Sequence, residues 1–282
     1  MRLGVFALKK DSLPSILGLI AGEGRFPLMV VAEAKKQGIS LVTLGIEGEA
    51  DEALETECDE FQWIGIGQIS RCVKTFRAAG ITQAIMAGRV RHVRVFQLLK
   101  PDRLMLKVLS RLPSRTTEAM LKTLADVLSE EGVELIDSTT LLTRFLASDG
   151  AMTKRKPNKE EMVDIEFGGR QARGLAALDI GQTVVIKRKS VVAAEAMEGT
   201  DDTVRRAGVV VKGPLVVVKV ARPDQDIRFD VPVVGPTTID SMVDAGASVL
   251  ALEAGRVLLV DRDELLGKAD ERRIAVYGFS DG

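Results

Sequence analysis

The first half of the chain alternates short apolar runs with helical patterns, and this order restricts the fold more than any other feature. An apolar run at Ile16–Ala21 ends in Gly22-Glu23-Gly24 and is followed by Pro27 and a helical pattern through Gln37. Three further runs are predicted strands: Ser40–Leu44, Thr82–Met86 and Val133–Ile136. Helical patterns cover Gln68–Ala79, Asp102–Leu112 and Arg115–Glu131. This alternation predicts an α/β domain with a parallel sheet covered on both faces.

In such sheets ligands bind beyond the carboxyl ends of the strands, so the glycine turns there are the candidate nucleotide site. The predicted binding residues are Gly22, Gly24, Gly88 and Arg89. The dinucleotide fingerprint G-x-G-x-x-G is incomplete, because Pro27 occupies its third glycine position. This departure argues against NAD as the ligand. A glycine turn that binds nothing is the structural alternative.

Composition excludes several classes of protein. The 282 residues are 46% hydrophobic, which suits two domains, and 39 Lys and Arg nearly balance 40 Asp and Glu, unlike a nucleic-acid binder. No apolar run approaches the roughly 18 residues of a membrane span, and two cysteines fit a reducing cytosol. With His92 the one histidine, a histidine-rich metal site is excluded. We therefore expect hydrolytic chemistry to depend on carboxylates, a hard metal and water.

Charge is segregated in the first half. Residues 47–60 carry eight acids and no base, as a solvated loop or helix face does. Residues 87–122 carry nine Lys or Arg against two acids. Within the latter, Arg103, Lys107 and Arg111 form a basic stripe on one helix, which is typical of a surface for anionic lipid or a phosphorylated ligand. The alternative is a helix that only packs its apolar face on the sheet.

The polar segment Ser148–Pro157 predicts a domain boundary. We expect an N-terminal extension at 1–15, an α/β domain at 16–150, a linker at 151–157 and an α+β domain at 158–282. One helix, Glu160–Ala177, opens this last domain. Its predicted strands are Gln182–Ile186, Ser190–Ala194, Leu215–Val220, Arg228–Val234, Ser248–Leu252, Arg256–Val260 and Arg272–Tyr277.

The segment Lys219–Asp240 carries the strongest chemical pattern. Asp226, Arg228 and Asp230 alternate with apolar residues, so an extended strand would present all three on one face. Lys219 and Arg222 lie close by in sequence. Carboxylates beside cations suit Mg²⁺-assisted chemistry on phosphate. A solvated edge strand with alternating charges is the alternative.

Further acids follow apolar runs next to glycine, at Asp179, in Glu195–Asp202 and at Glu253. Carboxylates in such turns can be aimed by a rigid scaffold, although Asp beside Gly is also ordinary turn chemistry. Thr200-Asp201 could equally cap a helix.

Six segments resemble the LpxI-type UDP-2,3-diacylglucosamine pyrophosphatases of lipid A biosynthesis, which are unrelated to the calcineurin-like enzyme. They occur in family order from about residue 16 to the end of the chain, and the C-terminal ones are long and specific. The segments are ILGLIAGEGRFP, IMAGRV, DIGQTVVI, EAMEGTDD, VKVARPDQDIRFDVPVVGPTTI and LEAGRVLLVD.

The resemblance implies a Rossmann-like N-terminal domain, a C-terminal domain of unusual fold, and a lipid-sized chamber between them. It implies Mg²⁺-dependent hydrolysis to UMP and 2,3-diacylglucosamine 1-phosphate (lipid X), with water attacking the phosphorus nearer the sugar. The family's essential aspartate matches Asp226, which by this resemblance would be a metal ligand or would orient the attacking water. Arg222 stands where many relatives carry lysine. The resemblance also implies a cytoplasmic homodimer, and its lipid substrate suggests peripheral contact with the inner membrane.

Together these arguments assign roles to the candidate residues. Mg²⁺ would be held by carboxylates among Asp226, Asp230, Glu195, Glu198 and Asp201, while Lys219, Arg222 and Arg228 steady the phosphates. The Gly22–Gly24 turn would take the uridine end. Two rival functions are a non-catalytic carrier of nucleotide sugar or glycolipid and a dinucleotide-dependent oxidoreductase.

Overall fold

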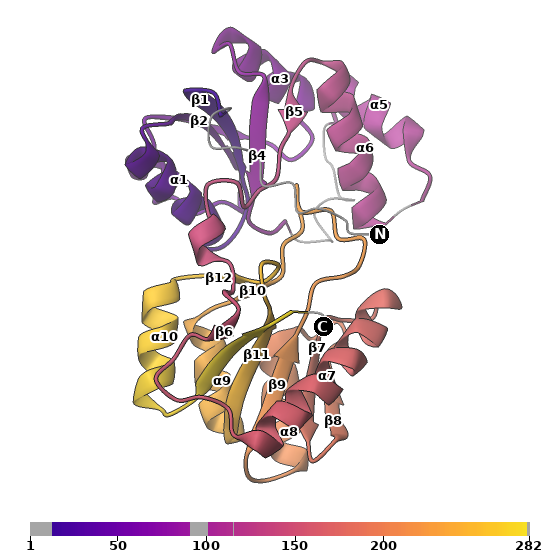
Figure 1. Cartoon of the computed structure of the whole chain (residues 1–282). Helices are drawn as coiled ribbons and strands as arrows, with labels where there is room; N and C mark the ends of the chain where they lie inside the picture. The colour runs from indigo at the N-terminus through magenta and orange to yellow at the C-terminus, as the bar shows by residue number, and fades with distance from the viewer. Residues whose placement is uncertain (1–12, 91–100, 115, 281–282) are drawn as a thin grey trace, which may run out of the picture. The chain divides into compact units, whose positions relative to one another are not determined.

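The computed structural model describes residues 13–90, 101–114 and 116–280. It divides into two compact units, Met1–Leu141 and Leu142–Gly282, each built around its own main sheet (Figure 1). Residues 1–12 of the predicted extension and His92 lie outside the described residues.

The first unit contains a five-stranded sheet in the order β3-β2-β1-β4-β5, and every pairing in it is parallel. Its strands are β1 (Ile16–Ala21), β2 (Ser40–Ile46), β3 (Glu60–Ile64), β4 (Gln83–Ala87) and β5 (Glu134–Leu135). Its helices are α1 (Phe26–Gln37), α2 (Leu54–Glu57), α3 (Ile69–Ala78), α5 (Arg103–Arg111) and α6 (Thr117–Glu130). The parallel sheet expected from the sequence is confirmed. Strand β3 was not expected, and α2 lies in the acidic segment that we expected to be solvated.

Close packing explains one glycine in this sheet. A Cβ atom on Gly18 of β1 would lie 2.7 Å from Cζ of Phe76, a fully buried ring on α3.

Asp102, the N-cap of α5, accepts from the backbone N–H of Met105 at 3.0 Å and of Ser70 at 2.6 Å. One carboxylate therefore caps α5 and fastens it to the start of α3.

The basic stripe of α5 is partly neutralised by α6. Glu130 pairs with Lys107 at 2.7 Å and with Arg111 at 2.6 Å. Hydrogen bonds from Lys107 and Arg111 lower the pKa of Glu130. On the opposite side of α5, Met105 and Val108 are buried. The helix thus packs its apolar face, as the structural alternative proposed, and uses two of its cations within the unit.

The second unit contains a six-stranded mixed sheet in the order β6-β13-β11-β9-β7-β8. Its strands are β6 (Gly150–Ala151), β7 (Thr183–Lys187), β8 (Ser190–Ala194), β9 (Leu215–Lys219), β11 (Ala247–Glu253) and β13 (Ala275–Phe279). The neighbours β9, β11 and β13 are parallel, whereas β6, β7 and β8 pair antiparallel. A second, two-stranded sheet pairs β10 (Val233–Val234) with β12 (Leu258–Leu259).

Helices alternate with the parallel strands of this unit, so its centre is α/β and the α+β expectation fits only the antiparallel strands. The helices are α7 (Lys159–Ala177), α8 (Thr200–Val210), α9 (Pro236–Ala245) and α10 (Arg262–Glu271), with a 3-10 turn at Thr143–Phe145. Helices α9 and α10 are absent from the elements predicted above. They connect β9 to β11 and β11 to β13, as crossovers between parallel strands require.

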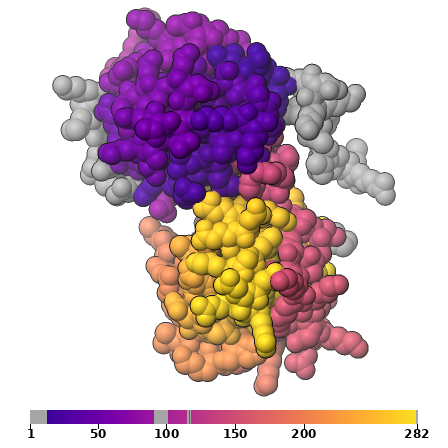
Figure 2. All heavy atoms as spheres, turned by 90° about the vertical axis from the view of Figure 1, so that its left-hand side faces the viewer, coloured from indigo at the N-terminus to yellow at the C-terminus, as the bar shows by residue number. Residues whose placement is uncertain are grey.

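Alternate residues of each strand face opposite helices. Val216 and Val218 of β9 pack in a core with α7, whereas Leu215 and Val217 pack with α8, α9 and α10. The same period of two applies to β7, where Val184 faces α7 and Val185 the other side. Part of the face opposite α7 is visible in Figure 2, where the yellow C-terminal segment lies at the surface of this unit between rose and orange segments.

The expected linker at 151–157 belongs instead to the second unit. Residues 150 and 151 form β6 on the sheet, and the Thr153 hydroxyl accepts from the backbone N–H of Val276 at 2.9 Å. Arg155 pairs with Glu161 of α7 at 2.6 Å. The division of the chain falls earlier, between Leu141 and Leu142. Polar composition alone misplaced it, because these side chains bond within a folded unit.

Within the described residues, no helix is both long and apolar enough to cross a membrane.

Two glycines on α7 allow a matched test of this packing. A Cβ on Gly168 would lie 2.6 Å from Cγ2 of Val218, whereas a Cβ on Gly174 meets nothing within 4 Å. Gly168→Ala should lower the free energy of unfolding by about 1–3 kcal/mol through overpacking. Gly174→Ala, its control, should raise it by about 0.5–1 kcal/mol because alanine favours the helix. Equal shifts in urea denaturation would contradict the proposed contact between α7 and β9.

Candidate active site at one edge of the second sheet

Several candidate residues meet where β9 ends. Because β9 runs antiparallel to β7, Lys219 at the end of β9 pairs with Thr183 at the start of β7. The backbone N–H of Glu195, just past β8, donates to the Thr183 carbonyl at 2.9 Å. Lys219 and Thr183 occupy the strand positions that face α8, given the alternation along each strand. The antiparallel order thus gathers three segments that are distant in sequence.

Lys219 is buried, with 5% of its surface exposed. Its Nζ donates to the hydroxyl of Thr200 at 2.6 Å and more weakly to that of Thr183 at 3.4 Å. Oε2 of Glu195 lies 4.0 Å from the same nitrogen. Burial lowers the pKa of Lys219, and the charges of Glu195, Asp201 and Asp230 oppose that shift.

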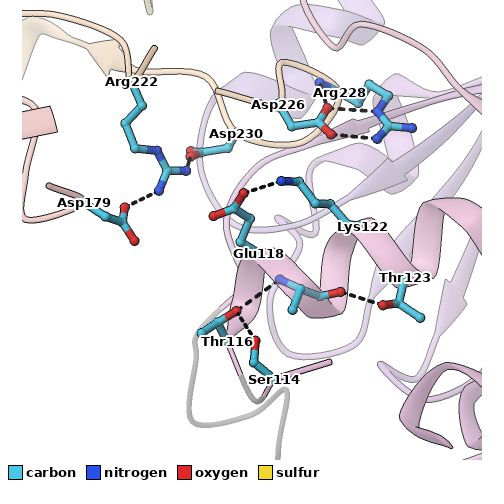
Figure 3. Close-up of polar contacts among 11 residues, drawn as sticks. Ser114, Thr116, Glu118, Lys122, Thr123, Asp179, Arg222, Asp226, Arg228 and Asp230 are labelled. Carbon is cyan, nitrogen blue, oxygen red and sulfur yellow. Dashed lines mark hydrogen bonds and ion pairs between the residues drawn. The ribbon is translucent and has the colours of Figure 1, made fainter. Parts of the chain in front are cut away.

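Arg222 is a clamp between two carboxylates. Its guanidinium donates to Asp179 and to Asp230, each at 2.5 Å, and Figure 3 shows it between them. The side chain is 18% exposed. The Arg222 backbone is fixed as well, since its N–H donates to Gln225 at 2.8 Å and its carbonyl accepts from Arg256 at 2.7 Å. The clamp therefore joins the loop after α7 to the loop after β9.

The strand predicted around Asp226 and Arg228 is wrong: this segment is a turn. The carbonyl of Asp226 accepts from the backbone N–H of Asp230 at 3.0 Å, which folds the chain back on itself. The carboxylate of Asp226 accepts from Nε and Nη2 of Arg228 at 2.9 and 2.6 Å (Figure 3). An aspartate that bonds groups two residues ahead competes with an extended ladder, and this local bonding overrode the alternating pattern.

The predicted metal ligands do not form one cluster. Across residues 13–90, 101–114 and 116–280, no three His, Cys, Asp or Glu side chains gather in a way that could hold a metal ion. Glu198 instead bonds Arg206 at 2.6 Å, and Asp226 bonds Arg228. Glu195 accepts from the hydroxyl of Thr200 at 2.9 Å and the N–H of Gln182 at 3.1 Å. Asp201 accepts from the hydroxyl of Thr238 at 2.8 Å.

Glu253 is a scaffold residue. It follows the apolar part of β11, is 7% exposed, and accepts from the backbone N–H of Ala221 at 2.8 Å. Its carboxylate therefore fixes the chain immediately before the Arg222 clamp.

In the first unit, the predicted glycine turns follow β1 and β4, which are neighbours at the centre of the sheet. Glu23 and Arg89 form a backbone bridge, and the N–H of Gly22 donates to the carbonyl of Ala87 at 2.8 Å. A Cβ on Gly22 would lie 2.7 Å from the carbonyl oxygen of Arg89, and Gly88 has φ +89°. Contact between the two turns therefore accounts for these two glycines. Gly24, at φ +102°, has open space where a Cβ would be.

Sequence reasoning missed two threonines of the second unit. Thr183 was read only as part of an apolar strand, and Thr200 only as a possible helix cap. The structure places both hydroxyls on Lys219. The sequence did contain one indication: Thr183 is two residues before Val185 and therefore lies on the same face of β7.

Glu198 supplies a pH test of its revised role. Hydrogen bonds from its own backbone and from Arg206 lower the pKa of Glu198 from 4.5 to about 2. Because the folded value is the lower one, Glu198 stabilises the fold above pH 4.5 and loses this effect as pH falls towards 2. Glu198→Gln should therefore be less stable than wild type above pH 4.5. The difference in the free energy of unfolding between the two proteins should shrink as pH falls towards 2.

Urea denaturation at several pH values would measure this gap. Glu166→Gln, at an exposed glutamate of α7 that pairs with Arg170, is the matched control. A gap between wild type and Glu198→Gln that stays constant with pH would contradict the assignment.

Residues 16–145 match the LpxI N-terminal domain and residues 148–277 match the LpxI C-terminal domain. The chain is 32% identical over 273 residues to a protein of Caulobacter vibrioides described as the UDP-2,3-diacylglucosamine pyrophosphatase LpxI, covering 93% of this chain and 96% of that protein.

Two solved structures resemble the chain remotely. Bordetella bronchiseptica WbmG, solved with NAD and UDP, has a TM-score of 0.28 and 13% identity, covering 45% of this chain and 37% of that one. The biotin carboxylase domain of Hydrogenobacter thermophilus 2-oxoglutarate carboxylase has a TM-score of 0.24 and 14% identity, covering 61% and 35%. Similarities at this level carry no argument.

Both halves of the chain match their respective family domains, in order and over nearly the whole length. The chain therefore belongs to the LpxI family of hydrolases.

Proposed function

We propose that this protein hydrolyses the pyrophosphate of UDP-2,3-diacylglucosamine in a Mg²⁺-dependent reaction, giving UMP and 2,3-diacylglucosamine 1-phosphate for lipid A biosynthesis. Family membership supports the substrate. The observation that supports the chemistry lies at the C-terminal end of β9 in the six-stranded sheet. There, buried Lys219 and clamped Arg222 lie at the two ends of one short segment. Carboxylates border both cations.

Pyrophosphate hydrolysis requires charge neutralisation and an oriented water more than it requires a histidine. Water forms a bond to the phosphorus nearer the sugar, the bond from that phosphorus to the bridging oxygen breaks, and the bridging oxygen leaves with UMP. Lys219, Arg222 and Arg228 would bind the phosphate oxygens whose charge grows. Asp226 would orient the water and accept its proton, held in place by its own turn.

The described carboxylates do not fit a cage of four protein ligands for Mg²⁺. They are compatible with a site that has fewer protein ligands, since Mg²⁺ often keeps several waters and takes one or two carboxylates together with substrate phosphates. Under this proposal, Asp201 and Asp230 would hold the ion together with water and the substrate phosphates. When bound, Mg²⁺ would neutralise phosphate charge.

The first unit would bind the uridine end as a Rossmann-like domain. Its strand order, β3-β2-β1-β4-β5, is the order of doubly wound nucleotide-binding sheets. The turns with Gly22, Gly24, Gly88 and Arg89 lie beyond β1 and β4, where that order reverses and such sheets bind ligands. By family resemblance we extend the proposal to a cytoplasmic homodimer with peripheral contact to the inner membrane.

UMP release from UDP-2,3-diacylglucosamine tests the function. Wild type with Mg²⁺ should release UMP, EDTA should abolish release, and Asp226→Ala should lower kcat by about a hundred-fold or more because the water loses its carboxylate. Asp244→Ala, at an exposed aspartate of α9, should leave release unchanged. Thermal melting of each variant would show whether it folds.

The outcomes separate the possible roles. No UMP release from folded, Mg²⁺-loaded wild type would overturn the hydrolase proposal in favour of a carrier. A normal rate in Asp226→Ala would overturn only the role of Asp226.

Arg222 provides a second test, because its guanidinium reaches two carboxylates at once. Lysine keeps the charge but cannot bond both in the same fork geometry. Arg222→Lys should therefore lower kcat/KM about tenfold, and Arg222→Ala should lower it further. Steady-state kinetics with Mg²⁺ would measure this order. Equal activity of wild type and Arg222→Ala would remove Arg222 from the mechanism.

A further inference from the structure

Thr200 stands at the centre of the polar network that surrounds Lys219. Its hydroxyl accepts from Nζ of Lys219 at 2.6 Å and donates to Oε1 of Glu195 at 2.9 Å. The hydroxyl of Thr183 lies 3.2 Å away. A hydroxyl has one donor and two acceptor positions. When its O–H donates to Glu195, the Thr200 hydroxyl can accept from both Lys219 and Thr183. These three contacts then use all of its hydrogen-bonding positions.

Helix capping does not explain this hydroxyl. The N-cap of α8 is Gly199, with φ 82° and no side-chain cap bond. Thr200 is the first helical residue, and its hydroxyl turns to the sheet edge instead of the helix amides. Helix α8 thus places Thr200 against the end of β9, and the Thr200 hydroxyl takes no part in capping the helix.

The network also limits where the Lys219 ammonium can lie. Lysine has four rotatable side-chain bonds and carries three N–H donors. Among the described residues, Thr200 and Thr183 take two of these donors, and Glu195 at 4.0 Å supplies opposite charge. In the proposed reaction, the third donor would bind a phosphate oxygen of the substrate. The charges of Glu195, Asp201 and Asp230 act on the same ammonium.

We propose that Thr200 is a positioning residue for the hydrolysis: its hydroxyl fixes the Lys219 ammonium at the sheet edge and couples it to Glu195. The inference rests on the proposed function and extends it to a residue that would act through Lys219 and Glu195. Without this hydroxyl, Lys219 loses its shortest hydrogen bond and Glu195 loses a donor. The ammonium would then sample orientations that do not meet the substrate.

Steady-state kinetics of UMP release from UDP-2,3-diacylglucosamine test the proposal. Thr200→Val keeps the side-chain size and removes the hydroxyl, so kcat should fall about ten- to a hundred-fold with little change in KM. Thr200→Ser restores the hydroxyl and should recover most of that loss. A general packing defect would not be rescued by serine, which lacks the methyl group.

Thr203→Val is the matched control on the same helix. Thr203 is fully buried, and its hydroxyl donates to the carbonyl of Gly199 at 2.9 Å and to Glu198 at 3.2 Å. This variant should lose stability but keep kcat. Urea denaturation of both valine variants would separate stability from turnover.

A double-mutant cycle decides whether Thr200 acts through Lys219. If it does, Thr200→Val should add little to the loss already caused by Lys219→Met. Losses that multiply, or an unchanged kcat in folded Thr200→Val, would overturn the positioning role while leaving the hydrolase intact. A wild-type protein that releases no UMP would instead overturn the proposed function, and this role with it.

Discussion

The buried ammonium of Lys219 is the constraint on which the second unit depends. A buried charge costs several kcal/mol unless it is paired and hydrogen-bonded. Here the partners come from three places: Thr183 at the start of β7, Glu195 after β8, and Thr200 at the start of α8. Satisfying one cation therefore fixes where two strands and a helix meet. The loop that leaves β9 starts from this fixed point, and it carries Arg222, Asp226 and Asp230.

Three acids of the second unit support the residues around the end of β9. Glu253 accepts from the backbone N–H of Ala221, and Glu198 accepts from Arg206 of α8. Asp179 accepts from one guanidinium nitrogen of Arg222. Such carboxylates orient neighbouring groups because each has a specific donor within hydrogen-bond distance. Thr200 belongs to this supporting set, and we propose that it matters because of the cation it holds.

Periodicity predicted much of the fold. Apolar runs located β1, β8 and all of β9, and the alternation of strands and helices predicted the parallel sheet of the first unit. It failed at Asp226–Asp230, where carboxylate bonds to nearby donors favour a turn over a strand. It also missed α9 and α10. Of the candidate site, sequence reasoning named Lys219 and Arg222 but grouped Glu198 with metal ligands, because spacing does not reveal that Arg206 reaches it.

The sequence by itself determined the residue types that can do chemistry here: one histidine, many carboxylates, and a segment rich in both charges. Together with its long C-terminal motifs, it also determined the family. Only the tertiary structure decided which of those residues meet. The antiparallel pairing of β7 with β9 aligns Thr183 with Lys219, and the start of α8 adds Thr200. Hydrogen bonds act over about 3 Å, whereas these residues are far apart along the chain, so no local pattern could encode their contact.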